Sequence, residues 1–558
     1  MVAIKEKSKK CHDQVSKDKS DDVPLKCHSV SQAIDDIGYG KFHFLLTLVV
    51  GITNLSDTIE MMILVLIDPI LKCTWQVSTK ELAFLITTVC LAMSISSPLW
   101  GFVTDNYGRR NALIGSSSLL FIFGLASAFS PSFMWLLVFR FFCGSFIACM
   151  PQCITLLMEY LPTSTRGRAN VYVALIITLG SCATVLIGRL TMDIEEEYRW
   201  RLIVALGTTP LLIFLICAYW VPESILYLVG TQRTMEAEET LRYIHRTNNG
   251  KKAVYDVNVS FCNVEKNTEL KKDHSNFNRI FVKLFDDAAL LLRKERRSST
   301  ILIWIQWFLL GTMYYGIMLL SVELVKVWDG GCIISNRDDF TPPSNFSFSK
   351  CMPFSSDDYF SLLWTSLAEF PGGLIALFIM DIIGRKKTFV LSGAIYTTSL
   401  CLLLSGCTLS TTLLVVILFI ARGACSAYSW CVNIYTREVH PTHIRAIGVG
   451  TASTFARIGG VVAPYFAQVL CEYSWKAAIG TFVLVGLLIT FIPFCLPLES
   501  MGLDLSTLTH KVEENQFDKI SAMQPDTERG LLLMAKENSS KDADEKSNAR
   551  RRTSSLER

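Results

Sequence analysis

At 558 residues the chain could hold several soluble domains, but 51% of its residues are hydrophobic and only 18% are charged. The net charge of +3 is too small to indicate a nucleic-acid partner, and the eight histidines show no catalytic or metal-binding spacing. Composition therefore argues against an enzyme and predicts neither a metal nor a cofactor.

The apolar residues form long blocks, and about 20 such residues are needed to cross a bilayer. Twelve blocks occur, near 42–67, 82–103, 112–130, 134–157, 169–190, 201–221, 300–324, 358–381, 388–407, 411–435, 447–470 and 475–497. They predict a membrane protein with two six-span bundles at 42–223 and 299–500, separated by a linker at 224–298. Residues 1–41 and 501–558 are expected to be tails, the second of them disordered.

Loop charge predicts the orientation of the spans. Lys and Arg are more frequent in the short loops after spans 2, 4, 8 and 10 than in the short loops of the opposite face. Because basic loops stay on the cytoplasmic side, both termini and the linker are expected to be cytoplasmic.

The first span carries two acids, and ionisable residues inside apolar spans are candidates for function because they are costly to bury. Asp57 and Glu60 are three residues apart and share nearly one helix face. Arg140 in the fourth span can pair with either acid; we prefer Asp57, with Glu60 as the alternative. A carboxylate paired with arginine stays ionised, and one separated from it in an apolar environment takes up a proton. Such a pair can couple protons to a solute, or the charges only fix helix packing.

The loops after spans two, four and six carry motifs that recur, in the same order, in the second half. Glu159-x-x-Pro-Thr-x-x-Arg166 recurs as Glu438-x-x-Pro-Thr-x-x-Arg445, and similar pairs are Asp105–Arg110 with Asp381–Lys386 and Pro222–Ser224 with Pro497–Ser500. Such duplication is typical of transporters built from two repeats. We expect ion pairs here to close an inner gate, because a solvated basic loop does not explain a repeated motif. The gate candidates are Asp105, Arg109, Arg110, Glu159, Arg166, Glu223, Asp381, Arg385, Glu438 and Arg445.

The longest loop on the opposite face, at 326–358, has features of an extracellular or lumenal segment. Asn345 begins an N-glycosylation sequon, and Cys332 and Cys351 could form a disulfide in such a compartment. Cys73 also lies on this face and is a competing partner.

The second half carries its own charges inside the spans. Glu369 lies in span eight, Arg422 in span ten and Arg457 in span eleven, where a packing role is favoured for Arg457. The near balance of acids and arginines over both halves predicts internal pairing, because an unpaired buried charge costs several kcal/mol. Candidates for a substrate cavity are Tyr314 and Tyr315 in span seven and Trp430 and Asn433 in span ten, although ordinary packing explains each of them as well.

Several of these segments resemble the major facilitator superfamily. The stretch from Gly101 to Arg110 resembles its signature loop, and Pro222-Glu223-Ser224 resembles the sugar-porter branch. Tyr314-Tyr315-Gly316 and the stretch from Leu363 to Gly372 look like the family of synaptic vesicle two-related proteins. The resemblance covers residues of about 30–502.

The resemblance implies an all-α membrane protein with twelve transmembrane helices in two pseudo-symmetric six-helix halves and alternating access. In proton-coupled sugar porters a helix 1 acid works with a helix 4 arginine, and Asp57 and Arg140 occupy matching places. The fifth span lacks glutamine, and the seventh lacks the glutamine-rich run of those porters, which argues against a sugar. The resemblance also implies a synaptic or secretory vesicle membrane, with the plasma membrane as the alternative.

Two hypotheses follow. The first is a monomeric secondary active transporter of a small organic ion or solute, with protons as the coupling partner. The second is a vesicle protein that uses the transporter fold as a binding or regulatory scaffold without transport.

Overall fold

The structure is a computed structural model that describes residues 30–250, 291–293, 296–331, 354–404, 410–440, 445–496 and 499. Within these ranges every regular element is helical. Eleven helical segments are long and apolar enough to cross a membrane. The predicted ninth span, α17 (Arg385–Leu403), is less apolar because it begins with Arg385, Lys386 and Lys387. With α17 the described residues contain the twelve expected spans, and the all-α membrane fold is confirmed.

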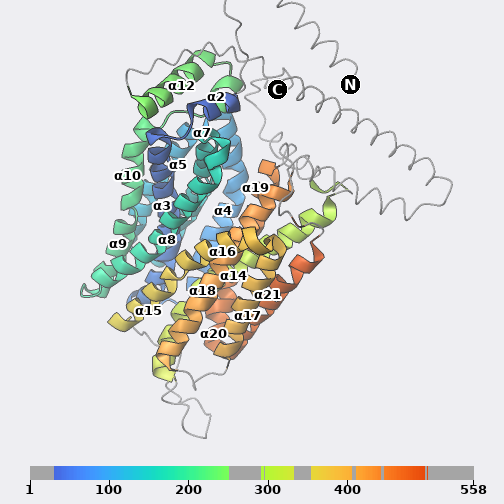
Figure 1. Ribbon diagram of the computed structural model, residues 1–558. Helices are drawn as coiled ribbons and strands as arrows, with labels where there is room; N and C mark the ends of the chain where they lie inside the picture. Colours follow the sequence, from blue (N-terminus) through green and yellow to red (C-terminus); the bar gives the residue numbers. More distant parts are fainter. Residues whose placement is uncertain are drawn as a thin grey trace, which may run out of the picture. The chain divides into compact units, whose positions relative to one another are not determined.

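The chain divides into two units, and Figure 1 shows the helices within each of them as a bundle. The first unit contains α2 (Val30–Ile37), α3 (Lys41–Trp75), α4 (Thr79–Tyr107), α5 (Arg109–Ala128), α6 (Phe133–Ile147), α7 (Gln152–Tyr160), α8 (Arg166–Leu190), α9 (Glu196–Gly207), α10 (Thr209–Cys217), α11 (Ile225–Gly230), α12 (Thr234–Asn249) and α15 (Ser356–Leu367). The second unit contains α14 (Arg297–Gly331), α16 (Glu369–Ile383), α17, α18 (Thr411–Val439), α19 (Arg445–Pro464), α20 (Leu470–Tyr473) and α21 (Trp475–Cys495).

The same span pairs recur in the two units. In the first, α3 packs on α8 and α4 packs on α6, which are spans one with five and two with four. In the second, α14 packs on α19 and α16 packs on α18, which are spans seven with eleven and eight with ten. The duplicated sequence motifs therefore correspond to duplicated helix packing.

Serine residues start several of the helices. Ser78 accepts the backbone N–H of Glu81, whose carboxylate accepts the Ser78 N–H at 2.9 Å, so that α4 begins with a capping box. Ser410 caps α18, and Ser474 caps α21, through their side-chain oxygens. These short polar residues satisfy N–H groups that a helix start otherwise leaves without partners.

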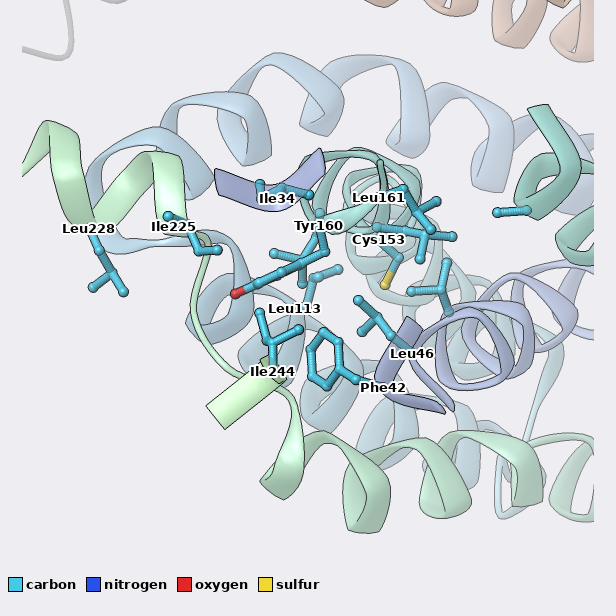
Figure 2. Close-up of a cluster of buried hydrophobic side chains, with 14 of the residues drawn as sticks. Ile34, Phe42, Leu46, Leu113, Cys153, Tyr160, Leu161, Ile225, Leu228 and Ile244 are labelled. Carbon is cyan, nitrogen blue, oxygen red and sulfur yellow. The ribbon is translucent and has the colours of Figure 1, made fainter. Parts of the chain in front are cut away.

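One end of the first unit carries a compact hydrophobic cluster, drawn in Figure 2. Ile34 of α2, Phe42 of α3, Tyr160 of α7 and Ile244 of α12 contribute buried side chains to it. Asn248 at the end of α12 accepts the backbone N–H of Phe42 at 3.0 Å. The start of the predicted linker is thus helical and tied to the first span.

The first half of span eight groups with the first unit. Tyr359 of α15 is buried, and its hydroxyl bonds the Arg199 guanidinium of α9, which lies 5.5 Å from the centre of its ring. Gly188 of α8 leaves room for this ring, because a Cβ there would lie 2.8 Å from it. Span eight therefore changes units between Leu367 and Ala368.

The predictions for the outer loop fall largely outside the described residues. Cys332, Cys351 and Asn345 lie there, so their disulfide and glycosylation stay predictions. Cys73 is disulfide-bonded, and no other cysteine in the described ranges forms a disulfide.

Candidate functional site

A buried ion pair joins spans one and four of the first unit. Arg140 on α6 donates from Nη1 to Oε2 of Glu60 on α3 at 2.7 Å, and the two side chains are 1% and 0% exposed. Gly124 of α5 lies beside the carboxylate, since a Cβ there would be 3.3 Å from Glu60 Oε1. Arg140 Nε and Nη2, and Glu60 Oε1, have no hydrogen-bond partner among the described residues. The pair is fully removed from solvent yet leaves donors and an acceptor unused.

This pairing corrects the sequence interpretation, which preferred Asp57 as the partner of Arg140. Glu60 takes that place, and Asp57 is only half-buried. Residues three apart on a helix differ by about 60° in direction, so two acids that share a face need not meet one partner. The longer glutamate also reaches further from the helix axis.

A second buried ion pair lies in the second unit. Arg422 on α18 donates from Nη2 to Oε1 of Glu369, the first residue of α16, at 2.7 Å. Their side chains are 2% and 7% exposed. Tyr314 of α14 donates to the other carboxylate oxygen at 3.4 Å. The arginines of spans four and ten are thus equivalent in sequence but take their acids from spans one and eight.

The end of the first unit that carries the repeated motifs is held by ion pairs and caps. Arg109, at the start of α5, forms a salt bridge with Glu159 at the end of α7. The carboxylate of Glu223 accepts the backbone N–H of Arg110 at 3.0 Å and so caps α5. Gly108 precedes this helix with φ of +95°, and a Cβ there would overlap the Glu223 carboxylate. A glycine is therefore required both by the backbone and by the cap.

Neighbouring groups tighten the same network. Ser224 donates to Glu159, and Tyr160 donates to the backbone oxygen of Glu223. Tyr227 of α11 donates to the backbone oxygen of Asn106 at 3.0 Å. Burial, and then the negative charge of Glu223, raise the pKa of Tyr227, which stays a neutral donor at physiological pH.

The matching end of the second unit repeats this arrangement. Arg385 donates to both oxygens of Glu438, at 3.2 Å from Nε and 3.0 Å from Nη2. Glu499 accepts the backbone N–H groups of Arg385 and Lys386 at 2.8 and 3.0 Å, and so caps α17 as Glu223 caps α5. Gly384 precedes the helix with φ of +93°. A carboxylate from the end of each half thus caps a helix more than a hundred residues earlier.

The remaining gate candidates have smaller roles in the geometry. Asp381 lies 3.4 Å from Arg385, and the charge of Asp105 acts on Arg109. Arg166 donates to the backbone oxygen of Leu161 at 3.2 Å. The side chain of Arg445 lies outside the described part of the structure.

The cavity candidates are only partly brought together. Tyr314 reaches Glu369, and its ring meets that of Tyr315 edge-on at 5.7 Å. The indole nitrogen of Trp430 lies against α16, 2.9 Å from a Cβ placed on Gly373. Asn433 donates to the backbone oxygen of Ser429 within its own helix. In the described ranges no group of three or more His, Cys, Asp or Glu residues could hold a metal ion.

Sequence reasoning missed two contributors to these sites. Glu499 was recognised as part of a repeat but not as a cap, and the signal was its match to Glu223. Ser426, which donates to the backbone oxygen of Glu369 at 3.0 Å, follows Arg422 by one helical turn. Its position four residues after Arg422, on the same helix face, is the sequence feature that could have pointed to Ser426.

With this geometry in place, the chain can be compared with known proteins. Residues 49–327 and 356–516 match the Major Facilitator Superfamily, and the chain belongs to this superfamily of multi-pass membrane transporters.

Two of its relatives carry the name synaptic vesicle 2-related protein, which confirms the resemblance found in the sequence. The protein from Rattus norvegicus is 33% identical, and the one from Xenopus laevis 34% identical, each over 86% of this chain and 83% of the relative. The xylose transporter XylE from E. coli, partially occluded and inward open, has a TM-score of 0.59 and 16% identity, with 83% of this chain and 99% of XylE covered. At that identity the likeness to XylE shows the fold alone.

Proposed function

We propose that this protein is a secondary active transporter that moves a small organic ion or solute by alternating access and couples it to protons at Glu60. The observation that carries the proposal is the Glu60–Arg140 pair, at 2.7 Å and removed from solvent. While the pair is closed, the guanidinium stabilises the carboxylate. If a conformational change separates the two while the carboxylate stays buried, the carboxylate takes up a proton, because burial without a partner disfavours its charged form.

Two features support this assignment over a structural role. The pair joins spans one and four of the same unit, so a local movement of α3 against α6, in addition to movement of the unit as a whole, changes the distance between the charges. Arg140 also keeps two nitrogens without partners among the described residues, whereas the Arg385 guanidinium uses all three of its nitrogens. A purely structural buried arginine is normally saturated with hydrogen bonds.

Each unit has one end that carries the repeated motifs, called its motif end, and the two motif ends are proposed to form a cytoplasmic gate. The contacts of Arg109 with Glu159 and of Arg385 with Glu438 each lie within one unit. The caps made by Glu223 and Glu499 also lie within one unit, and they tie the end of each half to its third helix. Each motif end can then move as one body, which alternating access by rigid units requires.

The name shared by the two relatives supports a location in vesicle membranes, with the plasma membrane as the alternative. Transport rather than a scaffold role is favoured because both buried ion pairs and both motif ends are retained.

The test is uptake by full-length protein in proteoliposomes with an imposed pH gradient. Pools of organic anions, cations and zwitterions are offered to wild type, Glu60→Gln and the matched control Asp57→Asn. We expect gradient-driven uptake that Glu60→Gln abolishes and Asp57→Asn retains. Uptake that ignores both the gradient and Glu60→Gln would overturn proton coupling. If folded protein takes up none of the pools, the scaffold hypothesis replaces transport.

A further inference from the structure

The second ion pair, Glu369 with Arg422, lies at a close crossing of α16 and α18. A Cβ on Gly372 of α16 would overlap the backbone carbonyl of Gly423 on α18. The two backbones therefore nearly touch, one residue away from Arg422 and three residues from Glu369. Ser426 also bonds the Glu369 backbone oxygen at 3.0 Å, which fixes the start of α16 against α18.

Each partner of this pair keeps one polar atom that the pair itself does not use. Arg422 Nη1 is buried and has no hydrogen-bond partner among the described residues. Glu369 Oε2 accepts the Tyr314 hydroxyl at 3.4 Å, which is a long and weak hydrogen bond. The two atoms carry opposite charge, and they belong to groups joined at 2.7 Å.

One aromatic side chain, Tyr314, contacts the acid of the pair, and two more lie nearby along the same helices. Tyr314 and Tyr315 of α14 are half-buried, as is Trp430 of α18, whose indole nitrogen lies against α16 near Gly373. Arg422, Ser426 and Trp430 are spaced by four residues and share one face of α18. Aromatic faces attract an alkylammonium group, and a guanidinium edge binds a carboxylate.

We infer that the Glu369–Arg422 pair is the recognition site for a small zwitterion, with its carboxylate on Arg422 Nη1 and its ammonium group on Glu369 Oε2. This inference rests on the proposed transport function and names the substrate class. Charge balance favours a zwitterion, because the pair is neutral and a singly charged solute would leave a net charge in a buried environment. A zwitterion can bind Arg422 Nη1 and, by displacing the weakly bound Tyr314 hydroxyl, Glu369 Oε2, and it adds no net charge.

The experiment measures binding by the full-length protein in detergent, without a gradient, from tryptophan fluorescence and thermal unfolding. The probes are ω-amino acids from β-alanine to 6-aminohexanoate, with the carboxylate-only and amine-only analogues of each length, such as butyrate and butylamine for γ-aminobutyrate. Because two charged contacts are made instead of one, one length is expected to bind about tenfold or more tightly than both of its analogues.

Variants locate the site. Single neutralisation can unfold the protein by leaving one buried charge, so the informative variant is Glu369→Gln combined with Arg422→Gln, which removes both charges together. It is expected to bind the zwitterion no better than the analogues. Tyr314→Phe, which frees Oε2 and keeps the ring, is expected to preserve the preference.

Three results would overturn the inference: equal affinity for zwitterion and analogues, an unchanged preference in the double variant, or no binding by any probe. Failure of proton coupling gives a different pattern. If the zwitterion binds but no gradient-driven uptake is measured, the binding site is supported and proton coupling is refuted. If only singly charged solutes show gradient-driven uptake, proton coupling is supported and the zwitterion site is refuted.

Discussion

Glu60→Gln is expected to lower the free energy of unfolding by about 3–5 kcal/mol, the usual cost of leaving a buried charge without its partner. The pair is almost fully buried, and the carboxylate of Glu60 is the one hydrogen-bond acceptor that Arg140 has in the described residues. The guanidinium cannot discharge itself by losing a proton. The substitution therefore leaves a cation in the bundle whose carboxylate partner has become a neutral amide.

The reverse substitution behaves differently. Arg140→Met leaves the Glu60 carboxyl, which can become neutral by binding a proton, so the cost is expected to be smaller, at about 1–3 kcal/mol. Combining the two substitutions removes the stranded cation. The double variant is thus expected to be more stable than Glu60→Gln alone, by about 2 kcal/mol.

The assay is reversible unfolding of the four proteins in mixed detergent micelles, followed by circular dichroism. The control is Asp57→Asn, alone and with Arg140→Met; because the hydrogen bond of Arg140 goes to Glu60, no rescue is expected from a change at Asp57. The reasoning is refuted if Glu60→Gln costs less than about 1 kcal/mol, or if Arg140→Met adds to its cost instead of relieving it.

Four further substitutions, two of them compared with each other, test contacts elsewhere in the chain. Gly108→Ala should destabilise more than Gly384→Ala, by about 1 kcal/mol or more. Both substitutions force a positive φ, but a Cβ on Gly108 would overlap the Glu223 carboxylate, whereas one on Gly384 would lie 3.1 Å from that of Glu499. Equal unfolding midpoints would contradict the close approach. Tyr359→Phe keeps the ring on Arg199 and loses its hydrogen bond, so stability should fall by about 1–2 kcal/mol, and an unchanged midpoint would show that the hydroxyl contributes nothing. Asn248→Ala should lower the free energy of unfolding by about 1 kcal/mol and speed amide hydrogen exchange in the first turn of α3 and in α12. Unaltered exchange would show that this hydrogen bond does not hold α12 to the first span.

Much of the fold follows from local sequence. The twelve apolar blocks predict the spans because bilayer thickness sets the required length, and that requirement does not depend on tertiary contacts. The repeated Glu-x-x-Pro-Thr-x-x-Arg and Gly-Arg motifs predict two equivalent halves, and the recurring span pairs agree with them. The identity of the charged residues inside the spans was likewise evident from the sequence.

The choice of partner for each charge was decided by packing. Periodicity places Asp57 and Glu60 on one face, but which of them meets Arg140 depends on the rotation of α3 and on the length of the side chain. The repeat suggests equivalent acids for Arg140 and Arg422, yet Arg422 takes Glu369 because Gly372 and Gly423 let α16 approach α18. The cap on α17 required Glu499 to return to a helix start more than a hundred residues away. Sequence patterns report the spacing along one helix, whereas ion pairs and caps need two segments within about 3 Å, a distance that only the packed helices define.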